Sequence, residues 1–402
     1  MPALDGIRIL DMTQYEAGTS CTQALAWLGA DVTKIEPTKV GEPGRGLEMG
    51  LWQDSEYFIN WNSNKNSVAI NLRDPKGRDI LLKMLPHYDV FVENYGPGVV
   101  EKLNIDYDTM KKIHPGIIYG RIKGFGTSGP YSKFKSYDTV AQAASGAMSI
   151  TGEEDGPPMR IGLTIGDSGA GMQLCTAILA AYIQRLRTNE GQLIELSMQE
   201  AMTYYMRTSI ALGSKWGERP APRRGNGSSA IINLYPCKPF GHNDYLYIMC
   251  VAPRMWTDLC RVIERPELEK DPRFAEHTGR VENRDVLIKE ITKWTSEHTK
   301  HEAMKILGEG GVPCSATLDT KDLFTDPHLV ERGFIHKVQH EEQGEVPLLG
   351  WPPRMSDCTV PIKPAPLLGT STAQVLKRDL NLSDEELSTL HEAGVIEANT
   401  KP

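Results

Sequence analysis

The strongest constraint on the fold is a regular alternation of short apolar strands and helices in the first third of the chain. The pattern predicts helices at 17–28 and 75–85, between strands at 7–12, 31–36, 67–72, 89–93 and 117–123. Strands separated by helices pair in parallel through right-handed crossovers, so we expect an α/β fold with a doubly wound parallel sheet. Ligands of such sheets bind beyond the carboxyl ends of the strands.

The composition is that of an ordinary globular protein, and its charge argues against one class of partner. The 402 residues carry a net charge of −8, so there is no general basic field for nucleic acid. The seven cysteines are scattered without a CxxC motif, which favours a reducing compartment. The sequence has neither an apolar run of membrane-spanning length nor a signal-peptide layout. We therefore expect a soluble, cytoplasmic protein that binds neither nucleic acid nor membrane.

One glycine-rich loop formally matches a dinucleotide-binding fingerprint. The loop is GFGTSG at 124–129, and Pro130 and a polar stretch follow it where the fingerprint needs a helix to open at once. The loop also follows the fifth predicted strand rather than the first. We interpret it as a turn or lid. Because motifs for metal or phosphate binding are also missing from the sequence, we expect neither NAD nor a metal.

Asp167 lies at the entrance to a long apolar helix. Gly166, Gly169 and Gly171 surround it and predict a flexible collar, while residues 172–183 predict a helix that is buried on every face. Local sequence leaves two interpretations open. Asp167 either caps the helix, or is an ionised nucleophile that backbone N–H groups and the helix terminus keep deprotonated.

The second half of the chain has a different composition. Residues 217–228 are rich in Pro, Gly and Arg, which predicts a linker or a mobile loop. A strand at 244–251 and helices at 255–263, 284–295 and 301–307 predict a smaller α+β unit. A hairpin-like stretch at 336–349 follows, and the capping box Ser383-x-x-Glu386 opens a final helix.

Nine segments, in order along the whole chain, resemble the family III CoA-transferases, which include formyl-CoA transferase, carnitine CoA-transferase and the α-methylacyl-CoA racemases. The segments are LDGIRILDMT at 4–13, AWLGADVTKIEP at 26–37, NKNSVAINLRDPKG at 64–77, VENYGPG at 92–98, GFGTSGP at 124–130, YDTVAQAASG at 137–146, GDSGAGM at 166–172, GVPC at 311–314 and PLLGTST at 366–372. The set is specific, although no single segment is.

The resemblance implies a ring-shaped chain in an interlocked homodimer, with a Rossmann-like large domain and a small α+β domain. The implied boundaries are 1–215 for the N-terminal part of the large, CoA-binding domain, 216–230 for a linker or lid loop, 231–311 for the small domain, and 312–402 for a linker and a C-terminal segment that returns to the large domain.

The resemblance also assigns residues to a site, with Asp167 as the nucleophile. It places CoA contacts at Glu16, Ala17, Ile70, Arg73, Asn94, Tyr95, Gly96, Lys102, Lys135, Ser136, Tyr137 and Asp138. Pro37 stands where the family has a phosphate-binding arginine, and Lys39 is the candidate substitute. The oxyanion candidates are Gly166, Ser168 and Gly169. Gly225, Gly227 and Ser228 are either the counterpart of a family lid or a solvated surface turn.

The activity that the resemblance implies is transfer of CoA from an acyl-CoA to a small carboxylic acid, through an anhydride and an aspartyl-CoA thioester. Two alternatives stay open: an acyl-CoA racemase or epimerase, and a non-catalytic acyl-CoA-binding protein. The family's racemases have a histidine where this chain has Tyr137, and a mere binder needs no nucleophile at Asp167. Glu16 replaces a glutamine of formyl-CoA transferase and the lid is shorter, which favours an acid other than oxalate or formate.

Overall fold

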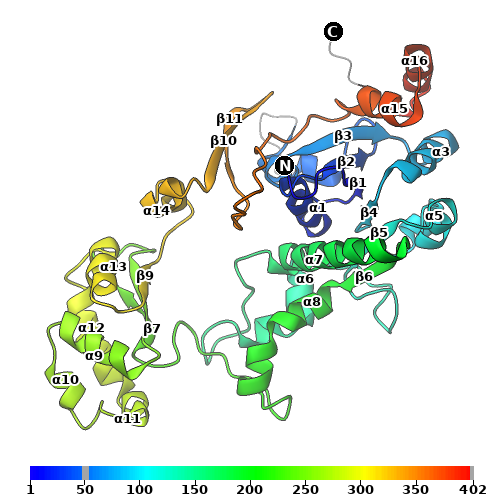
Figure 1. Ribbon diagram of the computed structural model, residues 1–402. Helices are drawn as coiled ribbons and strands as arrows, with labels where there is room; N and C mark the ends of the chain where they lie inside the picture. Colours follow the sequence, from blue (N-terminus) through cyan, green and yellow to red (C-terminus); the bar gives the residue numbers. More distant parts are fainter. Residues whose placement is uncertain (48–53, 399–402) are drawn as a thin grey trace. The chain divides into compact units, whose positions relative to one another are not determined.

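The computed structural model describes residues 1–47 and 54–398, which divide into two compact units (Figure 1). Unit 1 takes in the described residues of Met1–Met148, Arg160–Arg219 and Phe334–Pro402, and unit 2 takes in Ser149–Met159 and Pro220–Gly333. The small domain expected at 231–311 lies within unit 2, which is wider at both ends. Unit 2 also includes 149–159, a stretch that the sequence assigned to the large domain. The chain therefore passes between the units four times.

Unit 1 is built on a seven-stranded sheet in the order β12-β3-β2-β1-β4-β5-β6. Its strands are β1 (Arg8–Met12), β2 (Asp31–Glu36), β3 (Lys65–Ile70), β4 (Val90–Glu93), β5 (Ile118–Lys123), β6 (Leu193–Ser197) and β12 (Ile396–Glu397). Every neighbouring pair is parallel except β12, which pairs antiparallel with β3. The predicted parallel sheet is confirmed, and the strands predicted from the alternation begin and end within two residues of the observed ones.

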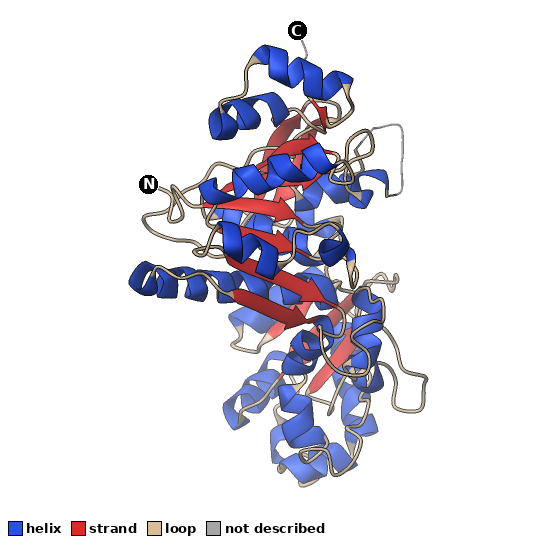
Figure 2. Ribbon diagram, turned by 90° about the vertical axis from the view of Figure 1, so that its right-hand side faces the viewer, coloured by secondary structure: helices blue, strands red, loops and turns tan. Residues whose placement is uncertain are grey.

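Helices cover both faces of this sheet (Figure 2). They are α1 (Ala17–Trp27), α2 (Glu56–Trp61), α3 (Pro75–Met84), α4 (Val99–Lys102), α5 (Tyr107–Ile113), α6 (Asp138–Ala144), α7 (Ile165–Thr188), α8 (Met198–Tyr205), α15 (Thr372–Leu380) and α16 (Asp384–Glu392). Successive strand residues point to opposite faces: Ile9 packs in the core under α1 and α7, and Leu10 packs in the core under α3 and α15. The doubly wound arrangement is therefore confirmed, as is the capping box at Ser383.

Helix α7 begins at Ile165, seven residues before the apolar run from which it was predicted. The three glycines therefore lie inside the helix, and the expectation of a flexible collar is wrong. A Cβ on Gly171 would lie 2.0 Å from Ser20 Oγ and 2.5 Å from the carbonyl oxygen of Ala17, so this glycine lets α1 approach α7 closely. The helix is not buried on every face either, because Ile183 is 58% exposed and Leu186 is 67% exposed.

Unit 2 has its own core around a three-stranded antiparallel sheet. The strands are β7 (Ile232–Pro236), β8 (Tyr245–Met249) and β9 (Cys314–Ala316). The helices are α9 (Pro253–Val262), α10 (Glu267–Lys270), α11 (His277–Glu282), α12 (Arg284–Thr295), α13 (Lys300–Glu309) and α14 (Pro327–Glu331). The hairpin of β10 (Ile335–His340) and β11 (Gly344–Leu349) belongs to unit 1. Among the described helices, none combines the length and the apolarity that crossing a bilayer requires.

Candidate active site

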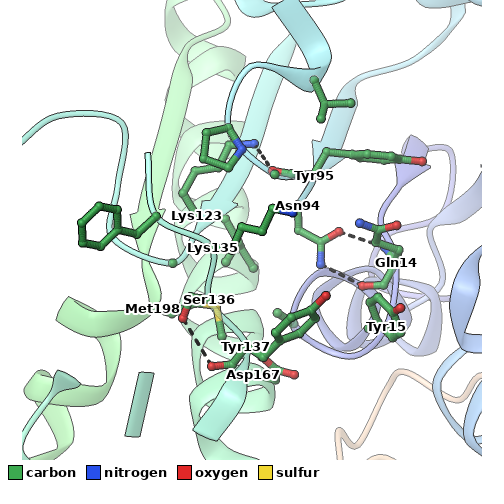
Figure 3. Close-up of a pocket in the computed structure, with 17 residues that line it drawn as sticks. Gln14, Tyr15, Asn94, Tyr95, Lys123, Lys135, Ser136, Tyr137, Asp167 and Met198 are labelled. Atoms are coloured by element: carbon green, nitrogen blue, oxygen red, sulfur yellow. Dashed lines mark hydrogen bonds between the residues drawn. The ribbon is translucent and has the colours of Figure 1, made fainter. Parts of the chain in front are cut away.

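A cavity of about 320 Å³ lies at the carboxyl edge of the large sheet (Figure 3). The strand order reverses between β1 and β4, and the loops that follow these two strands contribute Tyr15 and Asn94 to the cavity wall. Such a switch point is where doubly wound sheets bind their ligands. The segment after β5 adds Lys135 and Tyr137, and the first turn of α7 adds Asp167. Three strand-end segments and one helix terminus therefore converge on a single cavity.

Most of the residues that the sequence assigned to CoA are brought together here. The predicted residues that line the cavity are Ala17, Asn94, Tyr95, Gly96, Lys135, Ser136, Tyr137 and Asp167. Glu16 and Asp138 are not among the described lining residues, and their carboxylates accept hydrogen bonds from Thr164, just before α7, and from Gly166 in its first turn. The loop at 124–129 contains no helix, since α6 opens only at Asp138, so the dinucleotide fingerprint has no structural counterpart.

Four of the predicted contacts do not lie at the cavity. Lys39, Arg73 and Lys102 are exposed and are absent from its described lining. Lys39 follows β2 and Arg73 follows β3, which are the strands that lie away from β4. Ile70 is 1% exposed and its side chain packs in the core under α3, so a contact with CoA would have to use its backbone. All four contacts stay predictions.

The first turn of α7 is held by another carboxylate. The N–H groups of Gly166 and Asp167 donate to Asp138 Oδ1 at 2.8 and 3.3 Å, and the N–H of Ser168 donates to the carbonyl of Thr164 at 3.0 Å. Two of the three residues that the sequence assigned to oxyanions, Gly166 and Ser168, therefore have N–H groups that already have acceptors. An oxyanion role for them would require these bonds to break, and the role of Gly169 stays a prediction.

Three carboxylates surround the same helix terminus. Glu16 is 2% exposed, and the Thr164 hydroxyl donates to its Oε1 at 2.5 Å. Burial raises the pKa of Asp167 to about 8, and the neighbouring charges of Glu16 and Asp138 contribute to this increase. Burial also raises the pKa of Glu16 to about 7. The raised pKa runs against the expectation that the helix terminus keeps Asp167 ionised: burial outweighs the terminus, and Asp138 takes two of its N–H groups.

These pKa values predict a pH dependence that Glu16 controls. Attack by Asp167 needs its carboxylate form, so kcat/KM for CoA transfer should rise with pH until about pH 8. In Glu16→Gln a neighbouring negative charge is removed, the pKa of Asp167 falls, and the acidic limb should move to lower pH. Glu385→Gln, on the exposed face of α16, is the matched control and should leave the profile unchanged. An unshifted limb in Glu16→Gln would contradict the assigned charge coupling.

Tyr15 is a cavity residue that the sequence analysis missed. Its φ of 58° is uncommon for an aromatic residue, and its N–H donates to Glu42 Oε2 at 3.0 Å. Its ring meets that of Tyr137 edge-on, with centroids 6.1 Å apart, beside Asp167 in Figure 3. The one available signal was its position, immediately before Glu16 in the turn between the first strand and the first helix.

Hydrogen bonds tie the converging loops into one rigid wall. The Asn94 side chain accepts from the N–H of Gln14 and donates to the carbonyl of Gln14, both at 2.8 Å, which joins the loops after β1 and β4. Lys123 Nζ donates to Glu93 Oε2 at 2.8 Å and to the carbonyl of Tyr95 at 2.6 Å, so its ammonium group is already paired with a carboxylate. Lys135, by contrast, is exposed and has no ion pair among the described residues.

A buried ion pair supports the turn that carries Tyr15 and Glu16. Lys65 Nζ lies 2.9 Å from Asp11 Oδ2, and both side chains are fully buried. Although burial opposes ionisation, Lys34 and Lys65 hold the pKa of Asp11 down, at about 2. The hydroxyl of Thr22, on α1, also donates to Asp11. The network therefore fixes the end of β1 against α1.

The segment predicted to be a linker or lid is anchored inside unit 2. Arg223 donates to the carbonyls of Ser149 at 3.1 Å and Gly156 at 2.7 Å, and the N–H of Gly225 donates to the carbonyl of Gly152 at 3.0 Å. Gly227 is buried, and a Cβ there would lie 2.4 Å from the side chain of Asn233. Ser228 is exposed. That Gly225, Gly227 and Ser228 form a lid stays a prediction.

Comparisons with known proteins agree on one family. Residues 4–372 match CoA-transferase family III. A Streptomyces coelicolor protein named formyl-CoA:oxalate CoA-transferase is 40% identical over 409 residues, which cover 98% of this chain and 99% of the relative. A protein of the same name from Rhodopseudomonas palustris is 37% identical, over 99% and 98% of the two chains. The crystal structure of a CAIB/BAIF family protein from Brucella suis superposes with a TM-score of 0.83 at 29% identity, over 93% of this chain and 98% of that one. The chain therefore belongs to CoA-transferase family III.

Proposed function

We propose that this enzyme moves CoA from an acyl-CoA donor to a small carboxylic acid and that Asp167 carries the covalent intermediates. The observation that carries this proposal is the position of the Asp167 carboxyl. It lies in the first turn of α7 and faces the cavity that Lys135, Tyr137 and the loops after β1 and β4 also line. The names of the relatives support the same reaction class, because both are transferases that act on a CoA thioester and an acid.

In the proposed sequence, the Asp167 carboxylate attacks the thioester carbonyl, the C–S bond breaks, and a mixed anhydride forms as the thiolate leaves. The thiolate then attacks the aspartyl carbonyl, which releases the donor acid and leaves CoA on Asp167 as a thioester. The acceptor carboxylate attacks that thioester to give a second anhydride and a free thiolate. Attack of the thiolate on the acceptor carbonyl yields the new acyl-CoA and restores Asp167. Each step conserves the activated carbonyl, so no external energy source is needed.

Two other side chains of the cavity have roles in the proposed reaction. Lys135 is the cation without an ion pair among the described residues of the wall, and we assign it to a phosphate group of CoA. The backbone N–H groups of residues 166–168 already have acceptors, so side chains must stabilise the oxyanions. We assign that role to the Tyr137 hydroxyl. Closure of this cavity would protect the anhydrides from water.

Racemisation is the less favoured activity because the cavity lacks the required base. No histidine occurs among the described residues that line it, and Tyr137 stands where the resemblance places the histidine of the racemases. A phenol is a poorer base than an imidazole at neutral pH. Incubation with 2-methylbutyryl-CoA in D2O should therefore give transfer to acetate without incorporation of deuterium at the α-carbon.

Chemical trapping tests the proposed function directly. The protein is incubated with acetyl-CoA, quenched with hydroxylamine, digested and analysed by mass spectrometry. A hydroxamate should form at Asp167 alone, because a mixed anhydride and an aspartyl thioester both react with hydroxylamine. Asp167→Asn provides the unlabelled control. A hydroxamate at Glu16 or Asp138, or none at all during active turnover, would overturn the assignment of Asp167.

We also propose that the enzyme is a homodimer, interlocked as the resemblance implies. Ile183 and Leu186 on α7 form an exposed apolar face, and Leu193 on β6 and Tyr204 on α8 are exposed apolar residues of neighbouring elements. In sedimentation velocity the protein should remain dimeric on dilution to nanomolar concentrations, since separating interlocked chains requires unfolding. Charged substitutions at Ile183 and Leu186 should reduce the yield of folded dimer, and matched substitutions at Lys111 and Lys112 should not. A stable, active monomer would refute the proposal.

A further inference from the structure

A second cavity, of about 260 Å³, lies in unit 1 beside the first turn of α7. Its wall is mostly apolar and includes three tryptophans, Trp27 on α1, Trp61 on α2 and Trp351 after the β10–β11 hairpin, together with Met172 on α7 and Leu349 on β11. Neither the proposed reaction nor the predicted CoA contacts use these residues. The cavity is smaller than the roughly 300–1,000 Å³ that a whole drug-sized ligand occupies, so it suits only part of a substrate.

Three elements connect this cavity to the acidic cluster. On α7, Asp167 lines the first cavity and Ser168, the next residue, lines the second. On α1, Ala17 lines the first cavity and Ser20, almost one turn later, lines the second.

The third connection runs along α2. Burial and the charges of Glu16 and Asp167 raise the pKa of Tyr57, so the phenol lies within electrostatic reach of both carboxylates. Trp61, one turn further along α2, lines the second cavity. The second cavity therefore shares α1, α2 and α7 with the acidic cluster, and the Ser168 hydroxyl in its wall hydrogen-bonds to Glu16.

Several polar groups around this cavity are paired with one another. Gln23 Nε2 donates to the carbonyl of Asn60 at 2.7 Å and to Ser63 Oγ at 3.0 Å, and the Trp27 indole N–H donates to the same hydroxyl at 3.0 Å. The N–H donors of Gln23 and Trp27 are therefore already paired and not free for a polar ligand, whereas a hydrocarbon would gain by leaving water.

One donor in the wall is unused. The Trp351 indole nitrogen is buried and has no partner among the described residues. Because this nitrogen is covered by surrounding atoms, it offers no hydrogen bond to a ligand in the cavity. The wall is therefore suited to a hydrocarbon group.

We propose that this cavity receives the hydrocarbon part of the acyl group that Asp167 carries, so that the enzyme acts on monocarboxylic acids with an apolar chain or ring. This inference rests on the proposed function of Asp167. It separates this chain from the relatives reported above, because formate and oxalate, the acids in their names, have no hydrocarbon chain. The acidic residue at Glu16 agrees with it, since a second carboxylate beside Asp167 disfavours dianionic acids.

The test measures the binding of a thioester series to Asp167→Asn, which cannot form the covalent intermediates. The probes are CoA, acetyl-CoA, butyryl-CoA, hexanoyl-CoA and benzoyl-CoA, with Kd measured by calorimetry. The Kd should fall roughly fourfold for each added methylene until the cavity is full, which corresponds to about 0.8 kcal/mol per group. A Kd that is independent of chain length would overturn the proposal.

Two variants fill the cavity from different elements, Met172→Trp on α7 and Leu349→Trp on β11. Each substitution should abolish the decrease in Kd with acyl chain length and leave the Kd of free CoA unchanged. Ile113→Trp, on α5 and 42% exposed, is the control and should preserve the decrease in Kd with chain length. If Kd still decreased with chain length in both cavity-filling variants, the proposal would be overturned. Conversion of a dimer to monomers by these substitutions would also overturn it, because a second copy of the chain would then occupy the cavity.

The outcomes also separate this inference from the proposed function. If the wild type showed no CoA transfer and no trapped Asp167 while Kd still depended on chain length, the proposed function would fail and the cavity assignment would stand as a binding site. If transfer and trapping were intact and Kd did not depend on chain length, the cavity assignment alone would fail.

Discussion

Asp167→Asn is expected to lower kcat for CoA transfer by at least about 10³-fold, because an amide cannot attack the thioester. The substitution keeps the shape of the side chain, and no hydrogen bond of the cavity wall described above depends on its carboxylate. The Kd of CoA should therefore stay nearly unchanged. Steady-state transfer from acetyl-CoA and calorimetry with CoA measure the two quantities, and Asp357→Asn, at an exposed site, is the control. Substantial transfer by Asp167→Asn would end the covalent hypothesis.

The same substitution should stabilise the fold at alkaline pH. The pKa of Asp167 is about 8 in the folded chain and near 3.8 in an unfolded one, so the folded state binds the proton more tightly. The stabilisation from this group is fully present below about pH 4 and is lost as pH rises through about 8. Asn cannot ionise, so Tm of Asp167→Asn should exceed that of the wild type at pH 9. A lower Tm of the variant at pH 9 would contradict the raised pKa.

Lys65→Met is expected to reduce the free energy of unfolding by about 3–5 kcal/mol. The ammonium group of Lys65 lies 2.9 Å from Asp11 Oδ2 and also donates to Thr22 Oγ1 at 2.8 Å and Asn62 Oδ1 at 2.9 Å. Removing it leaves the Asp11 carboxylate fully buried without its closest cation. The loss would be measured by urea unfolding of the whole protein at pH 7, followed by tryptophan fluorescence and circular dichroism.

Three further measurements isolate the buried charge. In Asp11→Asn/Lys65→Met both charges are absent, and the double variant should be more stable than Lys65→Met. Lys102→Met removes an exposed ammonium and should change stability by less than about 0.5 kcal/mol. In the wild type, the pKa of Asp11 is lowered to about 2, so its contribution is present above about pH 4 and is lost as pH falls through about 2. If Lys65→Met lowered the free energy of unfolding by less than about 1 kcal/mol, groups other than Lys65 would be stabilising the Asp11 carboxylate.

The fold of unit 1 could be predicted because its sequence pattern repeats. Strands such as Val90–Glu93 are short, mostly apolar runs that alternate with helices, and parallel pairing follows from that order alone. The helix containing Asp167 was placed seven residues too late, because glycines are poor helix formers and the prediction used their local preference. Tertiary packing reverses that preference at Gly171, where any side chain would strike Ser20. Contact between distant segments is not visible in local sequence.

The residues that form the candidate site could largely be predicted from the sequence, but the pKa values of its carboxyl groups could not. Asn94 and Lys135 were found through the family resemblance, and the segments after β4 and β5 that carry them meet at one edge of the sheet. The raised pKa of Asp167 was not predicted, because it depends on burial of the carboxyl and on the charges of Glu16 and Asp138, none of which local sequence shows. Carboxylates that lie 29 and 151 residues apart in sequence act on one another only after folding has brought them together.

The return of the chain to unit 1 has a consequence for the order of events during synthesis. Strand β12, at Ile396–Glu397, pairs with β3 near the start of the chain, and Ser371 donates its N–H to the carbonyl of Ser67. A ribosome therefore finishes the whole of Pro220–Gly333 before it makes the residues that cover this edge of the large sheet. Until then β3 offers an unpaired edge to any neighbouring nascent strand. The smaller unit can thus complete its own core first, and the larger one is the part that needs protection on the ribosome.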